Sequence, residues 1–111
     1  MVDESRLQQR LIELQRKLLG VRWDLDEVDQ QIRLIESRAM VRVAEARDER
    51  GSPLYSTQEV RRAAMTAQLA EDDDYAAFRD RRRHLKREAD LLVLDIREVQ
   101  TQLPPEWPPG L

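Results

Sequence analysis

The residues best suited to chemistry gather in the last third of the chain, where basic side chains follow one another closely. They are Arg79, Arg81, Arg82, Arg83, Lys86 and Arg87, and the single histidine, His84, stands among them. Cations at this density can neutralise several phosphates of a nucleic acid. Acidic residues are interleaved at helical i,i+3 and i,i+4 distances, however, which is typical of a solvated, ion-paired helix face. The candidate contacts of an accessory nucleic-acid-binding protein are Arg79, Arg83, Lys86 and Arg87.

Carboxylates gather in a second place, the run 71–74, and Glu45 and Asp48 form a further acidic pair. Oxygen ligands of this kind suit a divalent cation. Capping of a helix N-terminus, with pairing to arginines across the chain, is the simpler interpretation. His84 lies four residues before Glu88, and this pair has too few ligands for a metal. The sequence therefore predicts no catalytic, cofactor-binding or metal-binding residue.

The composition fits a helical chain better than a β-sheet protein. Of the 111 residues, 37% are charged and 5% are aromatic, and only three are glycine, whereas β-sandwiches and barrels favour aromatic-rich strands and glycine turns. The formal net charge of −3 argues against a general coat on nucleic acid. The absence of cysteine excludes a disulfide framework and thiolate chemistry.

The cellular location is predicted from the charge of the first residues and from the length of the apolar runs. The opening MVDESRLQQR carries acidic residues where a secretory leader would be positive. No apolar run approaches the ~18 residues that a membrane helix needs. We therefore expect a cytoplasmic protein that does not contact a membrane.

Apolar residues recur every three or four positions through the first third of the chain. The ten members are Leu7, Leu11, Leu14, Leu18, Val21, Leu25, Val28, Ile32, Ile35 and Ala39. A sustained period of 3.5 residues is typical of a left-handed coiled-coil seam. The next step falls on Arg42, where we expect the seam to end.

A second seam of similar length lies near the C-terminus. Counted back, it consists of Leu103, Val99, Ile96, Leu92, Ala89, Leu85, Arg82, Phe78 and Tyr75. Only Arg82 is polar. Its position predicts a buried or interface ion pair with an acid of the first helix, rather than contact with a phosphate.

A turn lies midway between the two seams. The segment 50–56 contains Gly51 and Pro53, which interrupt regular structure. Ser56 and Glu59 have the spacing of a capping box, which predicts Ser56 as the N-cap of the next helix. The acidic run 71–74 predicts a kink or break in that helix.

These patterns predict an all-α fold, a long antiparallel helical hairpin of coiled-coil type. The helices are expected at about 4–49 and 57–103, joined by the turn 50–56. Equal seams around a central turn imply that residues in contact across the hairpin have numbers totalling roughly 110.

A flanking apolar row predicts that the hairpin does not exist alone. Ile12, Leu19 and Trp23 widen the first stripe beyond what one partner helix covers. We expect a homo-oligomer, with a dimeric four-helix arrangement favoured. The predicted interface consists of Ile12, Leu18, Leu19, Trp23, Leu25 and Ile32.

The C-terminal tail 104–111 carries four prolines, which remove backbone donors and exclude a helix. We expect a polyproline-like or disordered segment. Trp107 in this tail either docks on a partner, folds back on the hairpin or is exposed.

Three motifs follow one another between residues 48 and 75. A Gly-x-Pro-x-Tyr-Ser turn at 51–56 is followed by Arg-Arg-Ala-Ala at 61–64 and by an acidic break before Tyr75. This order resembles a group of small helical-hairpin proteins of phages, prophages and mobile elements. The resemblance implies an accessory role and carries no activity with it.

A long first helix followed by a Gly-x-Pro turn also occurs in another family. Arg22 and Asp29 fall where the all-helical chorismate mutases, which this chain also resembles, place a substrate-binding Arg and a structural Asp. The second Arg of that family falls on Ala39, and its substrate-contacting Lys falls on Arg50. This resemblance implies a small all-α enzyme that rearranges a dicarboxylate.

The sequence favours a non-catalytic coiled-coil interaction module of phage or mobile-element type. Such a module needs only a seam and an exposed surface, whereas an enzyme needs convergent groups in a pocket. The expected partners are a second copy and another protein. The alternatives are an accessory nucleic-acid-binding protein that uses the 79–87 cluster and an enzyme of chorismate-mutase type.

Overall fold

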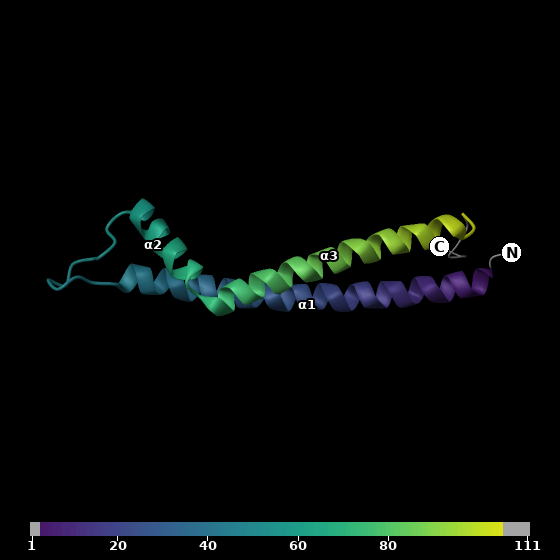
Figure 1. The fold of residues 1–111 in the computed structure, drawn as a ribbon, viewed down its shortest axis with the longest axis horizontal. Coiled ribbons are helices and arrows are strands. Elements are labelled where there is room, and N and C mark those ends of the chain that lie inside the picture. Colours follow the sequence, from purple (N-terminus) through teal and green to yellow (C-terminus); the bar gives the residue numbers. More distant parts are fainter. Residues whose placement is uncertain (1–2, 106–111) are drawn as a thin grey trace. The chain divides into compact units, whose positions relative to one another are not determined.

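The computed structural model describes residues 3–105, which form three helices (Figure 1). Helix α1 spans Glu4–Glu45, α2 spans Gln58–Ala70 and α3 spans Asp73–Gln102. The predicted all-α helical hairpin is confirmed, with α1 as the first arm and with α2 and α3 as the return. The described residues divide into two compact units: unit 1 contains 3–25 and 83–105, and unit 2 contains 26–82.

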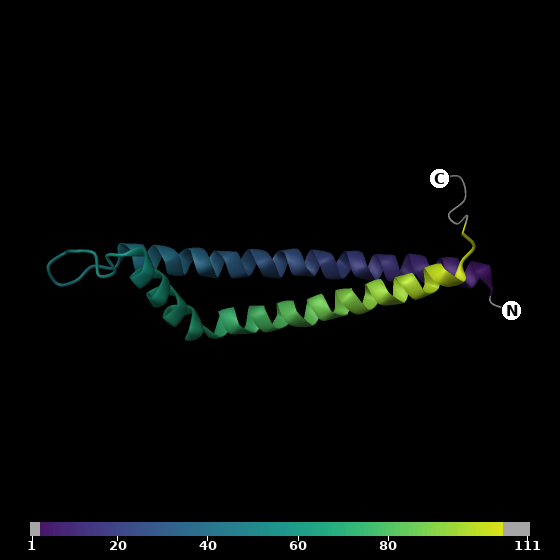
Figure 2. The same ribbon diagram turned by 90° about the horizontal axis from the view of Figure 1, so that it is seen from above.

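Unit 1 is a pair of antiparallel helical segments, the first part of α1 and the last part of α3, which run side by side (Figures 1 and 2). Its core consists of Leu11, Leu14, Leu18, Val21, Leu85, Leu92, Ile96, Val99 and Leu103. All nine belong to the two seams. Burial of each such side chain contributes about 1.5–3 kcal/mol, so the seams supply the main stabilisation of this unit.

Unit 2 combines the rest of α1 with the loop, α2 and the start of α3. Its buried side chains are Val28, Ala39 and Val43 of α1 and Leu69 of α2. Three polar contacts join α1 to the return arm. Arg82 Nε donates to Asp29 Oδ1 (2.7 Å), the Tyr75 hydroxyl donates to Glu36 Oε2 (3.2 Å), and Arg42 Nε donates to Gln68 Oε1 (3.4 Å). In each pair the residue numbers total 110 or 111, which is the predicted antiparallel register.

The first seam continues one step further than predicted. Arg42 is exposed, but Val43 is buried and extends the apolar stripe. A step of four residues from Ala39 reaches Val43, and steps of three and four both occur in a helix with 3.6 residues per turn. The expected end of the seam at Arg42 is therefore wrong.

Helix α1 ends at Glu45 rather than near residue 49. Beyond it, Asp48 Oδ1 accepts hydrogen bonds from the backbone N–H groups of Arg50 and Ser52, each at 2.9 Å. Gly51 takes a φ of 80°, which the tight turn requires and which glycine tolerates. Because Asp48 satisfies loop donors, the connection begins at residue 46 instead of residue 50.

Thr57, not Ser56, caps α2. Thr57 has an extended backbone, and its Oγ1 accepts a hydrogen bond from the N–H of Val60 at 3.2 Å. The capping box predicted for Ser56 and Glu59 is therefore wrong by one residue. Serine and threonine are both good N-caps, so the sequence alone does not decide which of these two adjacent residues caps α2.

The acidic run separates two helices, which confirms the break predicted at 71–74 within the return arm 57–103. Glu71 and Asp72 lie between α2 and α3. Asp72 Oδ1 accepts a hydrogen bond from the backbone N–H of Tyr75 at 2.9 Å, and Asp72 thus caps α3. Trp107 and most of the predicted tail lie outside the described residues.

Candidate interaction surfaces

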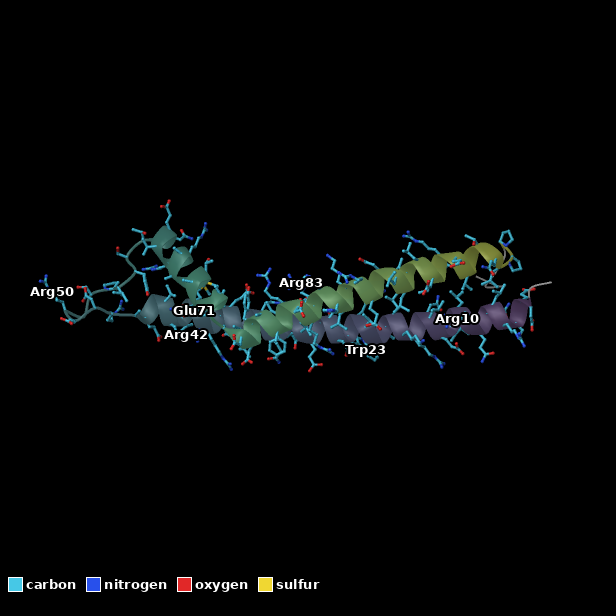
Figure 3. All side chains as sticks on the ribbon, viewed as in Figure 1. Arg10, Trp23, Arg42, Arg50, Glu71 and Arg83 are labelled. Atoms are coloured by element: carbon cyan, nitrogen blue, oxygen red, sulfur yellow. The ribbon has the colours of Figure 1, made fainter. Side chains whose placement is uncertain are left out.

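Three large apolar side chains of α1 are exposed in unit 1. The exposed fractions are 44% for Ile12, 48% for Leu19 and 65% for Trp23. Their spacing of seven and four residues places them on one face, roughly 140° around the helix from the buried seam. In Figure 3, Trp23 lies on the side of α1 that is turned away from α3. We call these three residues the outer face of α1.

The other predicted interface residues lie nearer the seam. Leu18 is buried within the chain, so we place it in the hairpin core rather than on an interface. Leu25 and Ile32 are half-buried. Of the six predicted interface residues, the three that are exposed are therefore those of the outer face of α1.

Two further exposed residues on α1, Leu34 and Val41, did not emerge from the sequence analysis. Trp23 follows Ile12 by eleven residues, and Leu34 follows Trp23 by eleven. An 11-residue period keeps side chains on one face of a nearly straight helix. This 11-residue period is the signal in the sequence that indicates Leu34, and it is separate from the 3.5-residue seam.

The predicted nucleic-acid contacts are exposed on α3. Arg79, Arg83 and Lys86 occupy i, i+4 and i+7 positions and so share a helix face. The Arg79 guanidinium lies over the Tyr75 ring, 5.5 Å from its centroid, in a cation–π arrangement.

Arg82 forms the ion pair that its seam position predicts. Its Nε lies 2.7 Å from Asp29 Oδ1, and the two side chains are 44% and 30% exposed. The pair therefore lies at the surface edge of unit 2 rather than in its core. This contact engages the Arg82 guanidinium within the chain, and Arg82 is not among the predicted nucleic-acid contacts.

Two of the acidic residues that suggested a cation site, Asp48 and Asp72, accept hydrogen bonds from backbone N–H groups. Asp48 holds the loop and Asp72 caps α3. Among residues 3–105, no group of three or more His, Asp and Glu side chains is placed to hold a metal ion.

A groove follows α2 in unit 2, and we call it the α2 groove. It consists of two hollows of about 560 and 530 Å³ that share Arg62 and Met65. Its main apolar residues are Met40, Val43, Met65 and Leu69. Its charged residues are Arg61, Arg62, Arg79 and Glu36. None of these residues was predicted as a site except Arg79, because the groove draws on three helices and follows no repeat.

The residues behind the chorismate-mutase resemblance have the following positions. Arg22 is exposed and lines none of the pockets found in the described part of the chain. Asp29 binds Arg82, and Arg50 is exposed in the loop.

None of the helices described in residues 3–105 has the length and apolar character needed to cross a bilayer. Comparison with protein-family models, curated proteins and solved structures finds no match to this chain. The two resemblances seen in the sequence therefore stay predictions.

Proposed function

We propose that this chain is a non-catalytic coiled-coil module that associates with a second copy of itself through the outer face of α1. The observation that carries the proposal is the exposure of Ile12, Leu19 and Trp23 on a helix whose opposite side holds the buried seam residues Leu11, Leu14, Leu18 and Val21. Leaving this much apolar surface in water is unfavourable. Exposed tryptophan is also the residue type most enriched at the energetic centres of protein interfaces.

A second copy is the partner that this face fits best. A two-fold interface brings the same patch of each copy together, so a row of apolar residues supplies its own complement. Packing α1 against α1 of a second copy would surround each long helix on two faces, as in a four-helix bundle. The mixed surface charge and absence of cysteine fit a cytoplasmic module of this kind.

Nucleic-acid binding has weaker support. Within the 79–87 cluster, Arg82 is paired with Asp29, and Arg79 covers the ring of Tyr75. Acidic residues interrupt the same segment, at Asp80 and Glu88. The resemblance to small helical-hairpin proteins of phages and mobile elements fits an accessory role for either function.

Sedimentation equilibrium tests the proposed function. The test variant carries Leu19→Gln and Trp23→Gln, and the matched control carries Leu91→Gln and Leu94→Gln, two exposed apolar residues of α3 in the same unit. We expect the native protein and the control to reach twice the 13.1 kDa chain mass at micromolar concentration. The outer-face variant should remain monomeric with unchanged helix content.

Two results would contradict the proposal. A native protein that stays monomeric at the highest soluble concentration excludes self-association. Loss of the dimer in the α3 control, with retention in the outer-face variant, places the interface on α3 instead.

A further inference from the structure

We propose that the α2 groove binds an acidic amphipathic segment of a partner protein. The whole groove lies in unit 2 and does not use the outer face of α1. Its described lining contains three guanidinium groups and one carboxylate, on a chain whose formal net charge is −3. The groove is therefore a local reversal of the charge of the molecule, and such patches select partners of opposite charge.

The charged groups around the groove differ in how they are engaged. Among the described residues, the side chain of Arg62 has neither a hydrogen bond nor an ion pair. Arg61 is held by a hydrogen bond from its Nε to the Tyr55 carbonyl (3.0 Å). The Glu36 carboxylate accepts the Tyr75 hydroxyl (3.2 Å). An incoming carboxylate thus meets Arg62 without first having to displace an internal partner, and charge-assisted contacts to guanidinium are the stronger kind.

Besides its charged residues, the α2 groove is lined by two methionines, Met40 and Met65. Met40 is more than half exposed, and Met65 lies where the two hollows join. Flexible thioether side chains adapt to apolar groups of different shape and are common on peptide-binding surfaces. A ligand that matches this lining carries bulky apolar side chains beside its carboxylates.

The form of the groove favours a peptide over a small molecule. It follows α2, whose 13 residues correspond to a length of about 20 Å. It is open to solvent along this length, whereas small-molecule pockets enclose most of the ligand surface. An amphipathic helix laid in a groove is a recurring mode of recognition that uses a surface of this length.

The same surface is poorly suited to single-stranded nucleic acid. Bases require exposed aromatic faces for stacking. Tyr75 is the aromatic residue in the described lining, and Arg79 lies over its ring. The occupant we infer is accordingly a protein segment rather than an oligonucleotide.

Selection from a phage-displayed library of random twelve-residue peptides on the immobilised full chain tests the inference. We expect the enriched peptides to combine Asp or Glu with Leu, Phe or Trp at helical spacing. A labelled copy of the most enriched peptide is then measured by fluorescence anisotropy. Arg62→Ser combined with Arg79→Ser should weaken its binding at least tenfold, and Met40→Ser should weaken it several-fold.

The control variant is Arg97→Ser, which removes an exposed arginine of α3 in unit 1 and should leave peptide affinity unchanged. Absence of enrichment, enrichment without acidic residues, or equal binding to the double arginine variant would each overturn the inference. The outer-face variant should still bind the peptide, so failure of self-association and failure of the groove are distinguishable. Loss of self-association in the double arginine variant would identify a second copy as the occupant and would also overturn it.

Discussion

Replacing Gly20 with alanine should stabilise the protein. Gly20 lies inside α1, where glycine is less favourable than alanine by about 0.8–1 kcal/mol because it loses more backbone freedom on folding. Beyond its own helix backbone and chain neighbours, nothing lies within 4 Å of a Cβ built at Gly20. No steric cost therefore offsets the gain, and we expect about 1 kcal/mol, or roughly 4–8 °C in Tm for a domain of this size.

Gly51→Ala is the matched control because the same chemical change should act in the opposite direction. Space is also open around Gly51, but its φ is 80°. An L-residue in this left-handed region costs about 1–2 kcal/mol, so the free energy of unfolding should fall.

Urea denaturation followed by circular dichroism, at the lowest usable protein concentration, measures both variants without a contribution from self-association. Opposite shifts of the two midpoints are expected. If Gly20→Ala lowers the midpoint as Gly51→Ala does, the reasoning is refuted, because Gly20 would then serve a close contact within the chain.

Three further predictions concern the fold. Leu14→Ala should lower the free energy of unfolding by about 2–5 kcal/mol, since Leu14 is 1% exposed; a loss below 1 kcal/mol in urea denaturation would argue against the seam. Thr57→Ala should lower the free energy of unfolding by about 1 kcal/mol, whereas Ser56→Ala should change it by less than about 0.5 kcal/mol. A larger loss for Ser56→Ala than for Thr57→Ala would indicate that Ser56 is the cap. A double-mutant cycle on Asp29 and Arg82 should give a coupling of about 0.2–1 kcal/mol that decreases with salt, and a salt-independent value would contradict their partly exposed placement.

The seams and the register could be predicted from the sequence because both depend on a simple period. Residues at 3.5-residue spacing must share a helix face, and equal seams around one turn leave a single antiparallel alignment. The same logic predicted that Arg82, the one polar member of its seam, would pair with an acid of the first helix. Asp29 is that acid.

The helix ends and the α2 groove were harder to predict. The helix ends depend on local backbone geometry, whereas the groove depends on how three helices pack together. Ser56 and Thr57 have almost equal capping strength, and only the backbone geometry decides between them. The groove forms from side chains of α1, α2 and α3, and its position depends on the break at Asp72. No periodic pattern connects Met40, Arg62 and Arg79, so only the structure brings them onto one surface.

The fluorescence of Trp23 tests self-association through the outer face most directly, because indole emission depends on contact with water. The chain contains two tryptophans, so a Trp107→Phe variant reports on Trp23 alone. At high dilution we expect red-shifted emission that acrylamide quenches fully, as the 65% exposure of Trp23 requires. At high micromolar concentration, where the mass doubles, the emission should shift to the blue and quenching should fall. Emission that stays red-shifted and fully quenchable while the mass doubles would contradict the proposed interface.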